Sequence, residues 1–213
     1  MQTIERIDLS NNWLTLVFLL VFILLAVLKT LNHHKLFEYS RAFFLKGFIE
    51  KKVEERVSFF TAFNIVLFAF TIVVFSLFFS FLIDFFITEN SLSFQMFFKT
   101  ILFVFIYISV FLILDFVLSH LFEIKFELAR FIASKLGYTY NIALLLFPFL
   151  ILTTYSSLNI SLLLSVFFML FTLSIVLTFI NNKNLIINKL FYFILYLCAL
   201  EIAPLLIIYK ITV

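Results

Sequence analysis

Two carboxylates inside apolar stretches are the residues with which this chain could do chemistry. Glu201 lies near the middle of the last apolar stretch, "LYLCALEIAPLLIIYK", and Asp115 lies near the end of an earlier one. A charged side chain at the centre of a membrane helix costs about 2.5–3.5 kcal/mol on insertion scales. Asp115 is close enough to a polar boundary to reach it, whereas Glu201 is not. We therefore predict that Glu201 is protonated, paired, or turned toward other helices.

Pro204 gives the same stretch a second special feature. A proline inside a helix has no N–H for the carbonyl four residues back, so that carbonyl stays available beside Glu201. Ala199 and Ala203 would let a second helix approach closely. Asn64 is a candidate polar partner on another segment. Two hypotheses stay open here, a structural hydrogen bond that locks helices together, and proton transfer or ligand binding.

Catalytic motifs do not accompany these carboxylates. The chain has no HExxH, GxSxG, P-loop or GxGxxG pattern. Its single cysteine, Cys198, excludes an internal disulfide and a cysteine-rich metal site. His33 and His34 are adjacent, and neighbours in sequence point to different sides of a helix. We therefore predict a non-catalytic protein without a metal site or a cofactor.

The composition places the chain in a bilayer. It is 65% hydrophobic and 13% charged over 213 residues, with a mean hydropathy of +1.22. Soluble domains are about 45–50% apolar and about 25% charged. The net charge of +3 is too small to indicate nucleic-acid binding, and no such motif is present. The lipid bilayer is therefore the first expected partner of this protein.

The apolar runs predict an all-α, polytopic bundle of transmembrane helices that forms one domain over 1–213. About 20 apolar residues cross the hydrocarbon core, and backbone groups in lipid must bond within their own segment. The six expected spans are 13–28, 57–83, 97–118, 141–155, 161–180 and 190–208. The fourth span is the shortest of them, so the sequence leaves open whether it crosses completely.

The basic residues predict the orientation of these spans. Loops rich in Lys and Arg stay in the cytoplasm. The segments expected inside are 29–56, 119–140 and 181–189, and they carry 12 of the 15 Lys and Arg residues. We therefore predict that both termini lie outside, in the periplasm, and that the chain is a multi-pass protein of a bacterial inner membrane.

The inner segments are expected to contain amphipathic helices at the cytoplasmic interface. In 29–56, aromatic residues alternate with charges, and Lys46, Lys51, Lys52 and Arg56 form a candidate docking surface for a partner or for anionic lipid. A basic loop that only sets the topology is the simpler interpretation. In 119–140, an apolar stripe predicts that the third helix continues, with Gly137 as its C-cap.

The C-terminal stretch "FYFILYLCALEIAPLLIIY" resembles the ending of a family of small polytopic membrane proteins from Bacteroidota, the domain of unknown function DUF4271. The resemblance rests on a Tyr-x-Cys-x-Leu-Glu-Ile-x-Pro-Leu pattern. The matching residues are Tyr196, Cys198, Leu200, Glu201, Ile202, Pro204 and Leu205. The resemblance implies the inner membrane of a Gram-negative bacterium and places Glu201 and Pro204 in a motif, and it implies no activity.

Two functions of different classes follow from these observations. The first is a non-catalytic accessory or scaffold subunit of a membrane complex, which binds a membrane-protein partner or a second copy of itself. The second is a small proton-coupled transporter or channel-like protein that uses Glu201. Transporters often carry broken helices rich in Gly and Pro near the midplane, and here only Pro148 and Pro204 interrupt spans. The first function is therefore favoured.

Overall fold

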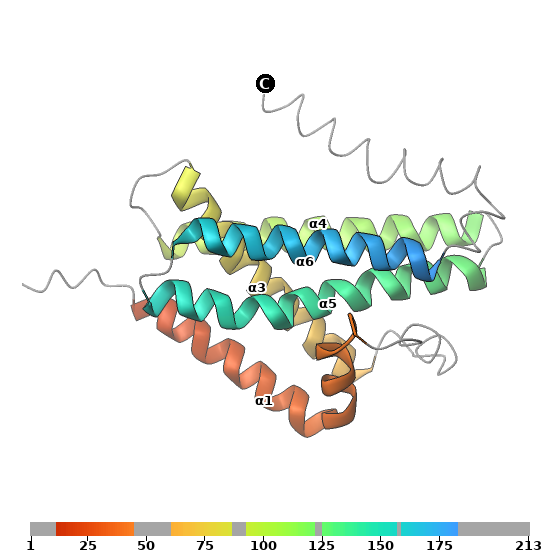
Figure 1. The fold of residues 1–213 in the computed structure, drawn as a ribbon, viewed down its shortest axis with the longest axis horizontal. Coiled ribbons are helices and arrows are strands. Elements are labelled where there is room, and N and C mark those ends of the chain that lie inside the picture. Colours follow the sequence, from red (N-terminus) through yellow and green to blue (C-terminus); the bar gives the residue numbers. More distant parts are fainter. Residues whose placement is uncertain (1–11, 45–60, 87–92, 122–124, 157–158, 183–213) are drawn as a thin grey trace, which may run out of the picture.

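The computed structural model describes residues 12–44, 61–86, 93–121, 125–156 and 159–182, with the backbone alone over 114–121 and 125–130. The regular structure in these residues is entirely helical (Figure 1). The helices are α1 (Asn12–Ser40), α3 (Ala62–Phe86), α4 (Phe94–Leu121), α5 (Lys125–Tyr155) and α6 (Ile160–Asn181). All five are long and apolar enough to cross a membrane. The all-α, multi-pass prediction is confirmed, while the sixth expected span, 190–208, lies outside the described residues.

Successive helices run in opposite directions through the bundle (Figure 1). As a result, the end of α1, the ends of α4 and α6 and the start of α5 lie toward the same end of the molecule. These are the helix ends that border the segments expected in the cytoplasm. Which side of a membrane this end faces remains a prediction.

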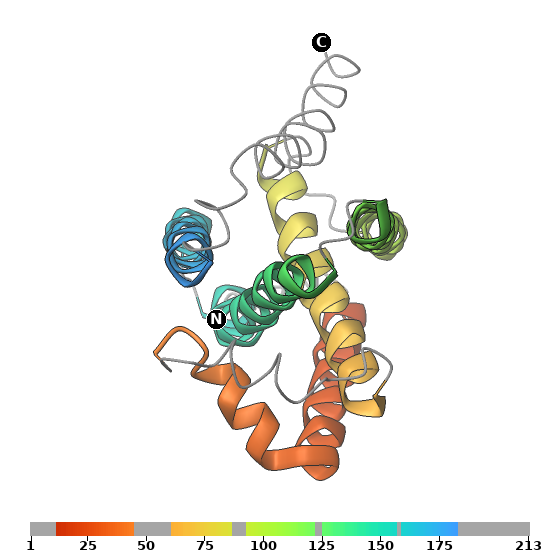
Figure 2. The same cartoon turned by 90° about the vertical axis from the view of Figure 1, so that its right-hand side faces the viewer.

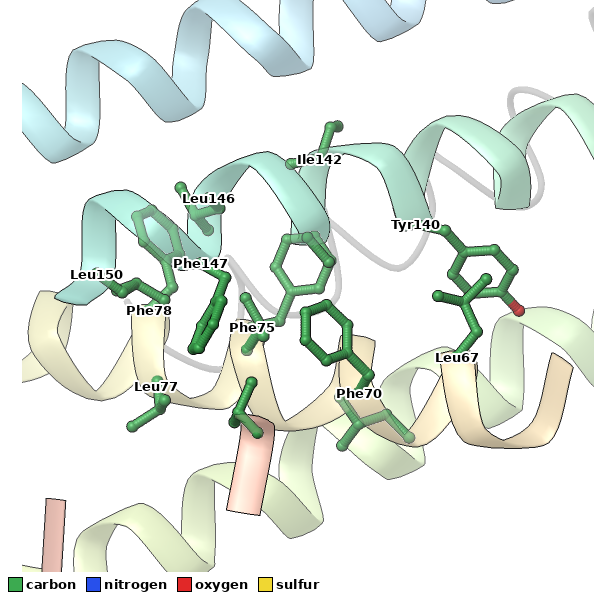
Figure 3. Close-up of a cluster of buried hydrophobic side chains, with 14 of the residues drawn as sticks. Leu67, Phe70, Phe75, Leu77, Phe78, Tyr140, Ile142, Leu146, Phe147 and Leu150 are labelled. Carbon is green, nitrogen blue, oxygen red and sulfur yellow. The ribbon is translucent and has the colours of Figure 1, made fainter. Parts of the chain in front are cut away.

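The core of the described bundle lies between α3 and α5 (Figure 3). Leu67, Phe70 and Phe78 on α3 and Leu146 and Leu150 on α5 are fully buried. Their spacing of three or four residues places each set on one face of its helix. The ring of Phe147 on α5 lies among aromatic rings of α1 and α3, with centroids 5.2 Å from Phe22, 5.9 Å from Phe70 and 6.3 Å from Phe18.

The helices α4 and α6 lie on opposite flanks of this central pair (Figure 2). In the most apolar stretch of α3, 56% of the residues are buried, and in that of α5 the share is 50%. The corresponding shares are 17% for α4 and 6% for α6. The bundle therefore has a packed centre and two outer helices whose side chains mostly face away from it.

The first helix bends sharply at Asn32. The backbone there is extended, with φ −162° and ψ 95°, and the Asn32 side-chain oxygen accepts a hydrogen bond from the Lys35 N–H at 3.0 Å. This is the geometry of an N-cap residue at a helix start. Asn32 therefore ends one helix and begins another, and residues 33–44, which we call the arm, turn back toward α5 (Figure 2).

The connection between the third and fourth expected spans differs from the prediction. A new helix, α5, begins at Lys125 and runs through Gly137 to Tyr155, so the prediction of a C-cap at Gly137 is wrong. The helix continues because Ser134, Tyr138 and Asn141 are buried against other elements, and a buried glycine permits close packing there. The fourth expected span is accordingly longer, because the apolar part of α5 covers Phe131–Tyr155.

Candidate functional site

A buried polar cluster lies at the end of the bundle where α5 begins and α6 ends. It is built on Ser134, Tyr138 and Asn141 of α5, which are spaced by four and three residues and therefore share one helix face. Their exposed fractions are 0%, 2% and 0%. Polar side chains inside an apolar bundle have to find partners, because an unmade hydrogen bond is costly there. These partners come from the end of α6 and from the arm.

The end of α6 supplies the first set of partners. The Asn182 side-chain amide donates to the Ser134 hydroxyl at 2.9 Å and to the Thr178 carbonyl at 2.8 Å. The Asn182 backbone N–H also donates to the Thr178 carbonyl, at 3.2 Å. The Asn181 amide donates to the Tyr138 hydroxyl at 2.5 Å. Asn182 therefore closes the last turn of α6 and ties this turn to α5.

The arm supplies the second set of partners. The Asn141 side-chain amide donates to the carbonyl oxygen of Tyr39, a residue 102 positions earlier in the chain. The ring of Phe43 stacks on the ring of Tyr138, with centroids 5.6 Å apart and an interplanar angle of 16°. The Tyr39 ring meets Tyr140 edge-on at 5.8 Å. The cluster therefore joins α1, α5 and α6 at a single place.

Two acceptor atoms of this cluster have no partner among the residues that the structure describes. They are the side-chain carbonyl oxygens of Asn141 and Asn182, and both are buried. The orientation of each amide is clear, because its nitrogen faces a backbone carbonyl that can only accept hydrogen bonds. Leaving such an atom without a donor costs about 1–3 kcal/mol. The chemistry of the cluster is therefore hydrogen bonding, with capacity for two more donors.

Most of the residues singled out in the sequence lie outside the described residues. These are Glu201, Pro204, Lys46, Lys51, Lys52 and Arg56. Asp115 lies on α4, where the backbone alone is described. Asn64 lies in the first turn of α3, half-buried, and its N–H donates to the Thr61 hydroxyl at 3.4 Å. Asn64 is thus at a helix start, while its relation to Glu201 stays a prediction.

The structure also places the two histidines and the remaining ligand-type side chains. The rings of His33 and His34 meet edge-on with centroids 5.8 Å apart, at the start of the arm. Within the described residues, no three His, Cys, Asp or Glu side chains come together in a group suited to a metal ion.

The sequence alone did not predict the polar cluster. Asn141 was assigned to the edge of a span, and Asn181 and Asn182 to the start of a loop, because polar residues beside an apolar run usually mark its end. A usable signal was present in the spacing of Ser134, Tyr138 and Asn141 on one helix face. Their partners on the arm and on α6 are far away in sequence, so the contacts themselves required the fold.

Comparison with known families gives one match. Residues 14–212 match the model of the family described as "Domain of unknown function (DUF4271)". The match covers nearly all of the described helices and also the C-terminal stretch that contains Glu201 and Pro204. Comparison with curated proteins and with solved structures gave no match.

Proposed function

We propose that this chain, which belongs to the DUF4271 family of unknown function, is a non-catalytic accessory or scaffold subunit of a membrane complex. That the chain is a multi-pass membrane protein follows from the five helices of membrane-spanning length and composition among the described residues. The proposal adds a membrane-protein partner, and location in a bacterial inner membrane with the cluster end of the bundle in the cytoplasm.

The observation that supports this role most is the outer face of α6. The face turned toward α5 carries Leu163 and Thr178, which are buried. The opposite face carries Ser161, Ser165, Phe168, Thr172, Ile175 and Phe179, and all six are exposed. Their spacing of four, three, four, three and four residues is the heptad pattern along which two helices pack together.

The residue types on this face suit a helix partner better than lipid alone. Exposed apolar side chains are normal in a bilayer, so exposure by itself decides nothing. Small hydroxyl residues, however, are enriched where membrane helices contact each other, because they let the backbones approach closely. Ser165 and Thr172 bond to carbonyls of their own helix, at 2.8 Å and 2.7 Å, so they add no unmade hydrogen bond to such a contact.

The centre of the described bundle gives transport less support. The interface of α3 and α5 is filled by Phe and Leu side chains (Figure 3). The buried hydroxyls of α3, on Thr71, Ser76 and Ser80, each donate to the carbonyl four residues back. Hydroxyls bonded in this way line no polar path through the helices. The candidates for a site of transported protons are therefore the carboxylates of Glu201 and Asp115, whose side chains lie outside the described part of the structure.

Site-specific photocrosslinking in native membranes tests the proposal. A photoreactive phenylalanine analogue replaces Phe168, which is 59% exposed on the outer face of α6. A matched chain carries the analogue at Phe22 of α1, which is 54% exposed. We expect a discrete adduct with a different membrane protein from position 168 and none from position 22. Thr172→Phe, on the same face, should remove the adduct while the protein remains folded.

Three other results would overturn the docking proposal. An adduct between two copies of the chain would indicate a homo-oligomer. Crosslinking within one chain would show that the face is covered by another segment of the same protein. Equal, diffuse products from both positions would indicate contact with lipid only. In each case α6 would not dock a different membrane protein.

Glu201→Gln separates the scaffold from the transporter hypothesis. Glutamine keeps the size of the side chain and removes its titratable proton. If Glu201 is structural, the substitution should change the abundance of the complex while any ion flux stays the same. A stable, fully assembled protein that has lost a pH-dependent flux in vesicles would instead establish the transporter function.

A further inference from the structure

The arm that follows Asn32 has two distinct faces. Its inner face carries Tyr39, Ala42 and Phe43, which are buried or half-buried against α3 and α5. Tyr39 reaches Phe63 of α3 as well as Tyr140 of α5, with ring centroids 5.9 Å and 5.8 Å apart. The inner face of the arm is therefore packed against α3 and α5, and the residues of the opposite face point away from the bundle.

The outer face of the arm combines aromatic rings with basic groups. His33, Phe37, Arg41 and Phe44 follow one another at steps of four, four and three residues, and all four are exposed. The Arg41 guanidinium lies 4.1 Å from the centre of the Phe37 ring. The His33 ring is nearly parallel to the same ring, at 6.5 Å. Phe44 is 84% exposed, the highest value among the large apolar side chains of the described residues.

The position of the arm is that of a membrane interface. It begins five residues after Leu28, where the long apolar run of α1 ends. It packs on Tyr138 of α5, seven residues beyond Phe131, the start of the apolar part of that helix. At 1.5 Å per residue this corresponds to about 10 Å along the helix, a depth at which amphipathic helices lie between headgroups and acyl chains.

We propose that the outer face of the arm binds the headgroup of an anionic phospholipid. Arg41 and His33 supply hydrogen-bond donors for the phosphate, and Phe37 and Phe44 lie against the upper part of the acyl chains. An arginine guanidinium suits a phosphate because its planar set of donors can bind two oxygens at once. Phe37 holds the guanidinium at the surface through a cation–π contact.

Charge complementarity favours an anionic lipid as the occupant. Arg41 and His33 are the basic groups of the outer face, while Lys35 and Glu38, with opposite charges, lie half-buried on its flanks. A neutral or acidic protein surface would leave Phe44 in contact with polar groups. A phospholipid provides the phosphate and the apolar chain in the order in which Arg41 and Phe44 occur.

Fluorescence quenching by brominated lipids tests this site in the full chain. Trp13 is the only tryptophan, so Trp13→Phe removes the background and Phe44→Trp places a probe on the arm. The protein is reconstituted into equimolar phosphatidylglycerol and phosphatidylcholine, with either lipid brominated. We expect a roughly fivefold preference for phosphatidylglycerol at this probe, the size that one basic residue contributes at a membrane surface.

Two further variants assign the preference to the arm. Arg41→Gln should reduce the preference to about one, and Arg41→Lys, which keeps the charge, should retain most of it. A probe at Phe168→Trp on the outer face of α6, in the same Trp13→Phe background, should show no preference because no charged side chain lies within three residues of it.

Four results would overturn the proposal. The first is equal quenching by both lipids at Phe44→Trp, and the second is a preference that survives Arg41→Gln. The third is loss of the preference on addition of inorganic phosphate, which would indicate a site for the free ion. The fourth is the absence of quenching by either lipid, which would show that protein or water covers the face. None of these results depends on whether α6 docks a partner, so this proposal can fail independently of the proposed function.

Discussion

The helices α3 and α6 have nearly the same hydropathy and opposite surroundings. More than half of the most apolar stretch of α3 is buried, whereas 6% of that of α6 is. In water such a difference in burial would require a difference in composition. In a bilayer it does not, because lipid chains are as apolar as a leucine side chain and the hydrophobic effect does not drive helices together. Side-chain packing and a few hydrogen bonds therefore determine that α3 is buried and α6 is exposed.

The comparison also shows two ways of holding a helix in place. Between α3 and α5, large rings and leucines interlock over several turns (Figure 3). The helix α6 places the ring of Phe167 4.4 Å from that of Phe78 on α3. It is tied to α5 at one end by Asn181 and Asn182. We expect the central pair to depend on the volume of its side chains, and α6 to depend on its polar contacts.

Phe147→Ala should have the largest effect on stability, because it removes a ring that contacts Phe18, Phe22 and Phe70 at once. Phenylalanine-to-alanine changes cost about 3–5 kcal/mol in soluble cores. Part of that cost is the transfer of the side chain from water, which is absent when the side chain is surrounded by lipid. We therefore expect a loss of about 2–3 kcal/mol in the free energy of unfolding, measured by titration with dodecyl sulfate. Phe168→Ala on α6 is the control and should change it by less than about 0.5 kcal/mol. Equal losses would contradict the division into centre and periphery.

Asn182→Ala should weaken α6 while leaving the central pair intact. It removes the bonds to the Ser134 hydroxyl and to the Thr178 carbonyl, which contribute roughly 1 kcal/mol each. Because the unpartnered side-chain oxygen of Asn182 disappears as well, the net loss should be about 1 kcal/mol. Hydrogen exchange should therefore become about fivefold faster in the last turn of α6, and the rates in α3 should not change.

The matched control for this experiment is Asn181→Ala, which removes a single bond to the Tyr138 hydroxyl. Its effect on exchange in the last turn should be smaller than that of Asn182→Ala. Faster exchange throughout α3 and α5 in the Asn182 variant would mean that α6 belongs to the same cooperative unit as the central pair. Side-chain packing of the central pair and polar attachment of α6 would then not be separate ways of holding a helix.

The sequence could predict that α3 and α6 exist, and it could not predict how differently they are surrounded. The runs 57–83 and 161–180 correspond closely to Ala62–Phe86 and Ile160–Asn181, because a stretch of about 20 apolar residues must be helical in lipid. Hydropathy treats a lipid-facing and a helix-facing phenylalanine alike, so it contained no information about burial. The start of α5 was predicted to be helical as a continuation of the preceding span, and the burial of its polar residues Ser134, Tyr138 and Asn141 was not predicted.

The candidate site was not predicted from the sequence. The interfacial character of 29–56 stays a prediction, and the fold of the arm back onto α5 depends on Asn32, which resembles any polar residue after a span. Asn141 meets Tyr39 across 102 positions of sequence, a distance over which no local pattern carries information. The hypothesis that Glu201 faces another helix stays a prediction.

Asn32→Ala tests whether the arm, like the pair α3 and α5, is held mainly by side-chain packing. The substitution removes the acceptor for the Lys35 N–H, and loss of such a cap costs about 1 kcal/mol. We expect the arm to separate from α5 more often, so that amides of the arm exchange about fivefold faster. Asn32→Asp keeps a cap oxygen and should exchange at nearly the original rate. If both variants behave like the unchanged chain, contacts of Tyr39 and Phe43 alone hold the arm.

The smallest effects are expected from the hydroxyls on the two contrasting helices. Ser76 on α3 is fully buried and donates to the Ile72 carbonyl at 2.6 Å, while Thr172 on α6 is exposed and donates to the Phe168 carbonyl at 2.7 Å. In both cases the carbonyl belongs to the same helix. Ser76→Ala and Thr172→Ala should therefore each change the free energy of unfolding by less than about 0.5 kcal/mol.

The outcome for Ser76 bears most directly on how the centre is held together. A loss above about 1 kcal/mol, measured by titration with dodecyl sulfate, would show that its hydroxyl supports a contact between helices. The central pair would then share the mode of attachment that we assign to α6. A silent Ser76→Ala beside a strongly destabilising Phe147→Ala would show that side-chain volume, with no help from hydroxyls, distinguishes the buried helices from the exposed ones.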